Sequence, residues 1–128
     1  MKIELTNKYV IGTHVMWFEI EMFTDFIDGM INLMETVEDR EKVTIDLCFN
    51  LSQKLEKIDK TKILIDGYNG LLEKFDNGVH RLQKVHPDVK WRVHDGDDFY
   101  FHADYRRDLN YNYCKKVDYV MWGETDSF

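Results

Sequence analysis

The sequence contains little of what marks disordered, disulfide-linked or membrane-spanning chains. It has a single proline and 44% hydrophobic residues, a composition typical of a folded globule. Its two cysteines, Cys48 and Cys114, fit no paired metal spacing, and we interpret them as free thiols in a reducing compartment. The sequence has no run of about 18 apolar residues and no apolar signal core at residues 1–4, so we expect a cytoplasmic protein without a membrane span.

Positive charge is also scarce, and three common phosphate-binding or nucleophile motifs are missing. The formal net charge of -7 argues against binding to a nucleic-acid backbone. A single nucleotide held by a few arginines and a metal ion is still compatible with that charge. We find no P-loop, no glycine-rich dinucleotide fingerprint and no nucleophile elbow in the sequence.

Hydrophobic periodicity predicts alternating strands and helices. Residues 43–49 alternate between apolar and polar side chains, which is typical of a strand. Apolar residues at spacings of three and four predict a helix over residues 19–38. Residues 59–86 predict one or two helices with an interruption, because Asp66-Gly67, Asn69-Gly70 and Asn77-Gly78 are turn signals. The other predicted elements are strands at residues 9–13, 89–93 and 117–122 and a helix at residues 103–115.

This order predicts an α/β fold, with a Rossmann-like, mainly parallel sheet between two helical layers. No linker or internal repeat divides the chain, so we expect a single domain over residues 1–128.

Polar side chains follow each of the predicted strands. Because ligands of open α/β sheets bind beyond the carboxyl ends of the strands, we expect these side chains to meet at one edge. The alternative is that strands simply end in polar loops. The residues at these ends are Thr13, His14, Asn50, His94, Asp95, Glu124 and Asp126.

The last predicted strand leads directly into two acids, Glu124 and Asp126, separated by Thr125. Two carboxylates at the mouth of a buried strand suit a hard divalent cation such as Mg²⁺ or Mn²⁺, which prefers oxygen ligands. The cation would offset the charge of a departing diphosphate. A solvated acidic loop is the alternative interpretation.

The preceding helix offers cations for the same ligand. Arg106 and Asn110 are four residues apart and share a helix face, with Arg107 on the neighbouring face. A guanidinium group suits multidentate phosphate contacts. The alternative is that the arginines pair with Asp104 or Asp108 on the surface.

The histidines indicate less. His14, His80, His86, His94 and His102 show no metal-binding spacing. We expect His80 and His86 to face solvent, and we keep His14 and His94 as candidates for ligand contact.

Four segments together resemble the nucleotide-binding half of GT-A-fold glycosyltransferases, especially the short phage and bacterial type. They are YVIGTH at residues 9–14, VTIDLCFN at 43–50, DYRRDLNYNY at 104–113 and YVMWGETD at 119–126. The similarity spans nearly the whole chain in element order, and only the last stretch is specific. It implies a transferase that binds a nucleotide-sugar donor and a divalent metal, and it implies the host cytoplasm if the chain is phage-encoded.

The resemblance also assigns roles to residues at the strand ends. It implies that Thr13 and His14 cradle the nucleobase. The family usually has an aspartate that holds the base or ribose at the end of the second strand, where this chain has Asn50.

The family's Asp-any-Asp metal motif matches Glu124-Thr125-Asp126, with Glu in place of the first Asp. The Arg and Asn that precede this motif match Arg106 and Asn110, with Arg107 as the alternative.

An acceptor-binding half and often a catalytic base are implied after the metal motif, where only Ser127 and Phe128 remain. We therefore expect a truncated domain without transfer activity of its own, and we assign no catalytic residue. The acceptor of a complete enzyme would be a glycan, a lipid or a protein. Two other functions stay open: a nucleotidyltransferase-like enzyme, and a non-catalytic binding module on the same fold.

Overall fold

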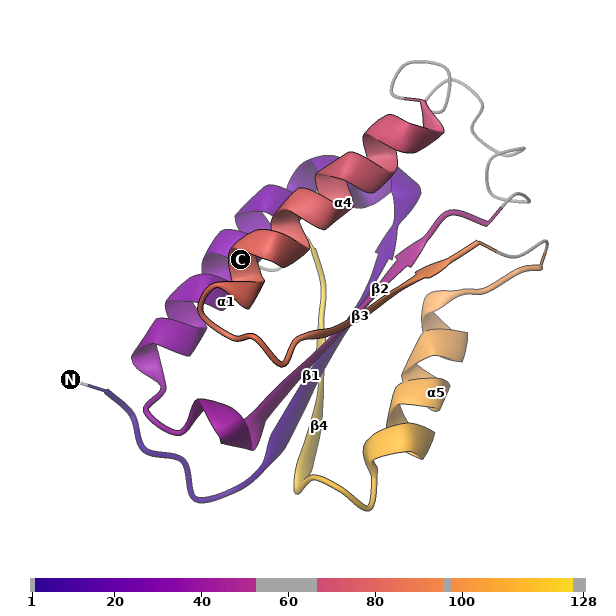
Figure 1. The fold of residues 1–128 in the computed structure, drawn as a ribbon. Helices are drawn as coiled ribbons and strands as arrows, with labels where there is room; N and C mark the ends of the chain where they lie inside the picture. Colours follow the sequence, from indigo (N-terminus) through magenta and orange to yellow (C-terminus); the bar gives the residue numbers. More distant parts are fainter. Residues whose placement is uncertain (1, 53–66, 96–97, 126–128) are drawn as a thin grey trace.

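The structure is a computed structural model that describes residues 2–52, 67–95 and 98–125 (Figure 1). Strands and α-helices alternate along the chain, with short 3-10 helices on either side of α1. In chain order the elements are β1 (Tyr9–Met16), η1 (Trp17–Glu19), α1 (Ile20–Thr36), η2 (Arg40–Lys42), β2 (Val43–Asn50), α4 (Tyr68–Gln83), β3 (Lys90–His94), α5 (His102–Tyr113) and β4 (Tyr119–Gly123).

The four strands form one sheet in the order β3-β2-β1-β4, and every neighbouring pair is parallel. The register places Tyr9 beside both Val43 and Tyr119, and it places Asn50 beside His94. All four carboxyl ends therefore lie at one edge of the sheet. The predicted α/β class with a parallel sheet is confirmed.

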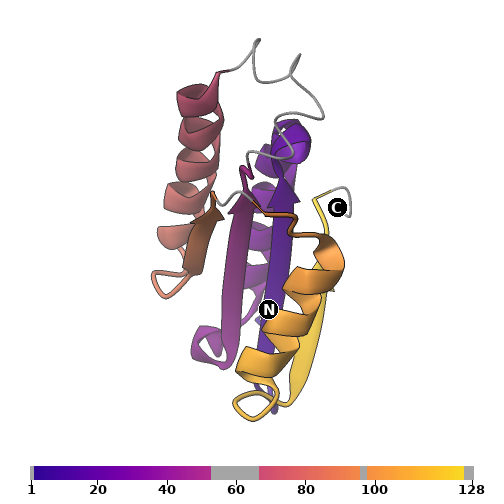
Figure 2. The same ribbon diagram turned by 90° about the vertical axis from the view of Figure 1, so that its right-hand side faces the viewer.

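Helices cover both faces of the sheet, as predicted (Figures 1 and 2). Helices α1 and α4 lie against each other on one face, where Lys74 binds Glu21 and Arg81 binds Asp28. Helix α5 lies on the opposite face, over β1 and β4. None of the described helices is both long and apolar enough to cross a membrane.

The alternation of side chains along the strands divides the core between these two faces. The larger cluster lies under α1 and α4 and includes Ile45, Leu47 and Phe49 of β2. The smaller cluster lies under α5 and consists of Val10, Cys48, Tyr105 and Leu109.

Helix α5 approaches β1 closely at Gly12. A Cβ at Gly12 would lie 2.4 Å from a methyl group of Leu109 and 2.7 Å from the hydroxyl of Tyr105. Only glycine therefore fits the present spacing between the helix and the sheet.

Several predicted strand boundaries were too short. β1 continues to Met16, so Thr13 and His14 lie inside the strand rather than after it. The physical reason is that Val15 is apolar and fully buried, and it pairs with Phe49. Asn50 and His94 are likewise the last residues of β2 and β3.

The predicted interruption of the second helical region was wrong for the described part, and residues 59–66 lie outside it. α4 is one helix that runs through Gly70 and Gly78. The turn signal at Gly67 was correct, because its φ of 70° lies in the left-handed region and the helix begins after it. Gly78 is buried under Phe23, and this packing outweighs the cost of about 1 kcal/mol for a helical glycine.

The predicted exposure of the two helical histidines was half wrong. His80 is exposed on α4. His86 is only 4% exposed, because the chain turns back after α4 and the amide of Val89 binds the carbonyl of His86. The Nε2 atom of His86 has no hydrogen-bond partner among the described residues.

Candidate functional site

The topology singles out the carboxyl ends of β1 and β4. From β1 the chain proceeds outward to β2 and β3 on the face of α1 and α4, and it returns to β4 through α5 on the other face. β1 and β4 are thus neighbours whose connections lie on opposite faces. Such a switch point is where open α/β sheets bind ligands.

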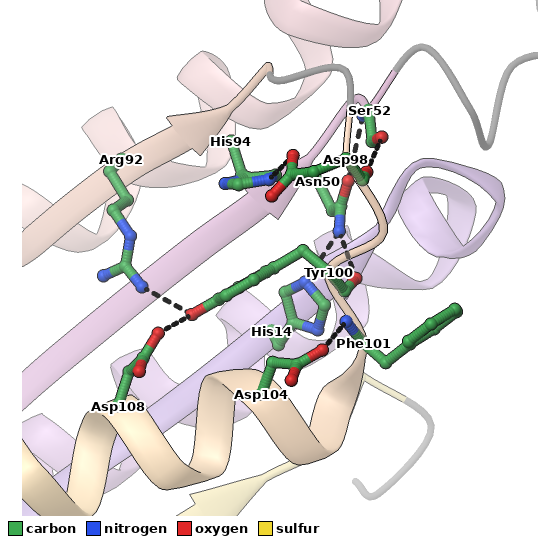
Figure 3. A network of polar contacts seen from close by, with 10 residues as sticks. All are labelled: His14, Asn50, Ser52, Arg92, His94, Asp98, Tyr100, Phe101, Asp104 and Asp108. Carbon is green, nitrogen blue, oxygen red and sulfur yellow. Dashed lines mark hydrogen bonds and ion pairs between the residues drawn. The ribbon is translucent and has the colours of Figure 1, made fainter.

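Asn50 is the centre of a buried polar network at this edge, and its side chain is fully buried (Figure 3). Its Oδ1 accepts a hydrogen bond from the amide of Ser52 at 2.9 Å. Its Nδ2 donates to the carbonyl of Tyr100 at 2.7 Å and contacts Nε2 of His14 at 3.1 Å. A backbone N–H can only donate and a carbonyl can only accept, so these two partners fix the orientation of the amide.

The fixed amide determines where His14 carries its proton. Nε2 of His14 receives the second Nδ2–H of Asn50, so the proton of the neutral ring is on Nδ1. Nδ1 of His14 lies 3.2 Å from Nδ1 of His102. His14 therefore donates to His102, whose own proton must be on Nε2.

His14 is held in the neutral form that this arrangement requires. Burial, together with the nearby His102, His94 and Arg92, lowers the pKa of His14 from 6.5 to about 3, and the charge of Asp104 opposes the shift only in part. The ring of His14 stacks on the ring of Tyr105, with the ring centroids 5.4 Å apart. The ring of Tyr100 meets the ring of His14 edge-on, with the centroids 5.3 Å apart.

Glu19 lies beyond His102, at the start of α1. Its Oε2 accepts a hydrogen bond from the amide of Met16 at 3.1 Å, and the hydroxyl of Thr125 lies 3.4 Å from the same atom. Its Oε1 lies 3.9 Å from Nε2 of His102. One carboxylate thus joins the ends of β1 and β4 and faces the imidazole at the start of α5.

A second network ties α5 to the sheet beneath His14. The hydroxyl of Tyr105 donates to Oδ1 of Asp46 at 2.7 Å, and that of Tyr100 donates to Asp108 at 2.6 Å. Burial raises the pKa of both tyrosines, and the neighbouring carboxylates raise it further, so both hydroxyls stay protonated donors. Arg92 lies 3.6 Å from Asp46 and donates to Tyr100 at 3.4 Å. We assign this network to the support of the site.

Arg106 and Glu124 meet at the β4 end of the same edge. The guanidinium group donates to Oε1 of Glu124 at 2.5 Å and lies over the ring of Trp122 at 5.1 Å. The partner predicted for Glu124 in metal binding, Asp126, lies outside the described residues. Within the described ranges, no group of three or more His, Cys, Asp or Glu side chains is placed to hold a metal ion.

The other predicted ligand residues are separated. Thr13 is buried on the α1 face, where a Cβ at Gly123 would lie 2.8 Å from its hydroxyl, whereas His14 points to the α5 face. Arg107 pairs with Asp104 at 3.3 Å, which is the alternative that the sequence left open. Asn110 is exposed on α5. Ligand contacts by these residues stay predictions.

The predicted loop after β3 joins the site through His94. Nε2 of His94 lies 2.9 Å from Asp98, and its ring stacks on Tyr100 with centroids 4.4 Å apart. The backbone of Asp98 accepts a hydrogen bond from the hydroxyl of Ser52 at 2.6 Å (Figure 3).

Sequence reasoning missed Ser52, Tyr100, His102 and Glu19 as parts of the site. A polar residue two positions past a buried strand and a histidine at the predicted start of a helix were the available signals for Ser52 and His102. Glu19 and Tyr100 carried no signal, because the contacts that bring them into the site, with Thr125 and Asn50, are with residues 106 and 50 positions away along the chain.

A hollow at the opposite edge of the sheet has different chemistry. Its volume is about 150 Å³, and Tyr9 and Val43, the first residues of β1 and β2, help to line it. Its other lining side chains are apolar, so it lacks the polar groups that gather at the carboxyl edge.

Comparison of the chain with protein-family models, with curated proteins and with solved structures found no match.

Proposed function

We propose that this chain binds a nucleotide-diphosphate sugar together with a divalent cation at the carboxyl ends of β1 and β4, as the donor site of a glycosyltransferase-like domain. The observation that carries the proposal is the contact between Arg106 and Glu124 beside the switch point. This contact supports the proposal because a guanidinium group can bind phosphate, a carboxylate can bind a metal ion, and the sequence resemblance implies both roles.

The two side chains suit the two parts of the donor. A guanidinium group binds diphosphate oxygens through several parallel hydrogen bonds. Arg106 occupies Oε1 of Glu124, and no described residue donates to the second oxygen, which is a suitable ligand for Mg²⁺ or Mn²⁺. With Asp126 as a second ligand, the bound cation would neutralise charge on the departing diphosphate.

The starts of α1 and α5 do not favour phosphate, which leaves Arg106 as the phosphate-binding group on this part of the edge. Helix N-termini commonly bind phosphate, but α1 and α5 each begin with a carboxylate of their own. Glu19 accepts from the amide of Met16 before α1, and Asp104 accepts from the amide of Phe101 at α5. This arrangement disfavours a nucleotidyltransferase, which would hold a triphosphate at the first helix start.

A non-catalytic binding module is the second candidate. The observation that favours it is that Arg106 and Glu124 already neutralise each other, so the edge is stable without a ligand. In that case the changes Glu124→Ala and Asp126→Ala would leave every interaction of the chain intact.

Thermal unfolding and calorimetry of the 128-residue chain with UDP-glucose and GDP-mannose test the proposal. We expect one donor to raise the melting temperature only when Mn²⁺ or Mg²⁺ is present. Glu124→Gln should abolish the metal dependence, and Arg106→Gln should weaken the binding of both the sugar nucleotide and its diphosphate.

Matched controls for these variants lie on the other face of the sheet. Glu35→Gln changes an exposed acid of α1, and Arg81→Gln changes a half-exposed arginine of α4. Both should bind the donor as the unmodified chain does. If neither UDP-glucose nor GDP-mannose binds with Mn²⁺ or with Mg²⁺, the proposal is refuted.

A further inference from the structure

We propose that Glu19 and His102 form a hydroxyl-binding pair, which holds a sugar or ribose hydroxyl of the bound ligand between the two side chains. This inference rests on the proposed function and names the part of the site that recognises hydroxyl groups. Its basis is the hydrogen-bond direction along the chain of side chains from Asn50 to His102.

The hydrogen-bond direction makes His102 a donor towards the ligand side. Asn50 donates to Nε2 of His14, and His14 donates from Nδ1 to Nδ1 of His102. A neutral imidazole carries one proton, so the proton of His102 is on Nε2. A proton on Nδ1 of His102 would set two N–H groups of His14 and His102 against each other across 3.2 Å, so Nδ1 of His102 is the acceptor of this contact.

Glu19 supplies the matching acceptor in a fixed position. Its Oε2 is held by the amide of Met16 at 3.1 Å and lies 3.4 Å from the hydroxyl of Thr125. Its Oε1 faces Nε2 of His102 across 3.9 Å, which is too long for a direct hydrogen bond. The side chains are 43% exposed for His102 and 20% exposed for Glu19, so a ligand can reach them.

A donor and an acceptor at this separation select the group that bridges them. A hydroxyl can accept from Nε2–H of His102 and donate to Oε1 of Glu19 at the same time. A phosphate oxygen offers no donor and is repelled by Glu19, and an ammonium group offers no acceptor for His102. A water molecule fits the same geometry, and a ligand hydroxyl would replace it without loss of hydrogen bonds.

The positions of these side chains predict how a bound nucleotide sugar is oriented. Glu19 and His102 lie at the starts of α1 and α5, and Arg106 lies one helical turn further along α5. The diphosphate is expected at Arg106, and a hydroxyl-bearing ring is expected at Glu19. Ribose and the transferred sugar are the two sources of such a hydroxyl.

Calorimetry with hydroxyl-deleted ligands tests the pair. The probe is UDP-glucose or GDP-mannose, whichever binds the unmodified chain more tightly, with analogues that each lack one ribose or one sugar hydroxyl. Loss of one particular hydroxyl should weaken binding about tenfold, the scale of a hydrogen bond to a charged group. The identity of that hydroxyl distinguishes ribose from the transferred sugar.

Glu19→Gln is the decisive variant. The oxygen of the new amide can still accept the hydrogen bond from the amide of Met16. The NH₂ group of the new amide then faces the Nε2–H of His102, which is also a donor. We expect about tenfold weaker binding of the complete ligand and unchanged binding of the analogue that lacks the critical hydroxyl. Equal weakening of both ligands, or no weakening of either, overturns the inference.

Two further measurements keep the test independent of folding and of the nucleotide. His102→Leu should give the same pattern as Glu19→Gln, and the exposed α4 variants Glu73→Gln and His80→Leu should bind normally. If no sugar nucleotide binds, the proposed function fails and NMR titration with D-ribose and D-glucose decides the inference. Shifts at His102 that disappear in Glu19→Gln support it, and their absence overturns it.

Discussion

Asn50 donates a hydrogen bond from Nδ2 to Nε2 of His14, and this contact across 3.1 Å sets the direction of every later hydrogen bond towards His102. The strand register brings the two residues together, because β1 and β2 are parallel and Met16 pairs with Asn50. Two residues that are 36 positions apart in the sequence thus become one buried unit at the carboxyl edge.

Replacement of Asn50 by leucine should destabilise the fold strongly. The variant keeps the side-chain volume but removes the partners of the Ser52 amide, the Tyr100 carbonyl and His14 Nε2. Each buried polar group left without a partner costs about 1–3 kcal/mol, so we expect a total loss of about 3 kcal/mol or more. Urea unfolding measures it. The exposed variant Asn110→Leu should stay within about 0.5 kcal/mol of the unmodified chain.

His14 should make the stability depend on pH in mildly acidic solution. Its pKa in the folded chain is about 3, below the value of 6.5 for an unperturbed histidine. Between these values the unfolded chain binds more protons, so the free energy of unfolding should fall as the pH drops from 6.5 towards 3.

His14→Phe should flatten this dependence, because the variant has no group to protonate at that position. Urea unfolding across the same pH range measures the slope, and the exposed α4 variant His80→Phe serves as the control. A slope that is the same in His14→Phe and the unmodified chain would show that His14 is not buried in the neutral form.

Two helical glycines should respond in opposite directions to alanine. At Gly78 a Cβ would lie 2.4 Å from a ring carbon of Phe23, so Gly78→Ala should cost about 1–3 kcal/mol. At Gly29 no atom of the described residues outside the adjacent helix backbone lies within 4 Å of the added Cβ, so Gly29→Ala should stabilise the chain by up to about 1 kcal/mol. Thermal unfolding of both variants checks the contrast, and a stabilising Gly78→Ala would contradict the close packing of α1 on α4.

The two cysteines should differ in reactivity. Cys48 is fully buried, and burial raises its pKa to about 11, whereas Cys114 is exposed. Alkylation requires the thiolate, so iodoacetamide should modify Cys114 in the folded chain and Cys48 only after denaturation. Mass spectrometry of the digested protein identifies the adducts. Rapid modification of Cys48 under native conditions would place it outside the core under α5.

Much of the fold follows from local pattern alone. Alternation over residues 43–49 and the apolar spacing of residues 19–38 predicted β2 and α1 to within two residues at each end. The pattern failed where burial outweighed a local signal. Gly78 reads as part of a turn next to Asn77, but its missing side chain lets α4 pack on Phe23.

The candidate site was less predictable, because its contacts join distant parts of the chain. Proximity to the end of a predicted strand placed Asn50, the last residue of β2, and Glu124, the residue after β4, at the carboxyl edge, where the structure has them. Sequence could not show that Asn50 is saturated by Ser52, Tyr100 and His14, or that Arg106 pairs with Glu124 while Arg107 pairs with Asp104. These choices depend on which atoms face each other after the layers have packed.

The positions of the imidazole protons test the account most directly. A long-range ¹H–¹⁵N correlation spectrum at neutral pH distinguishes the two neutral tautomers from the imidazolium form. We predict a proton on Nδ1 of His14 and a proton on Nε2 of His102. A proton on Nε2 of His14, or one on Nδ1 of His102, would contradict the hydrogen-bond direction on which the hydroxyl-binding pair depends.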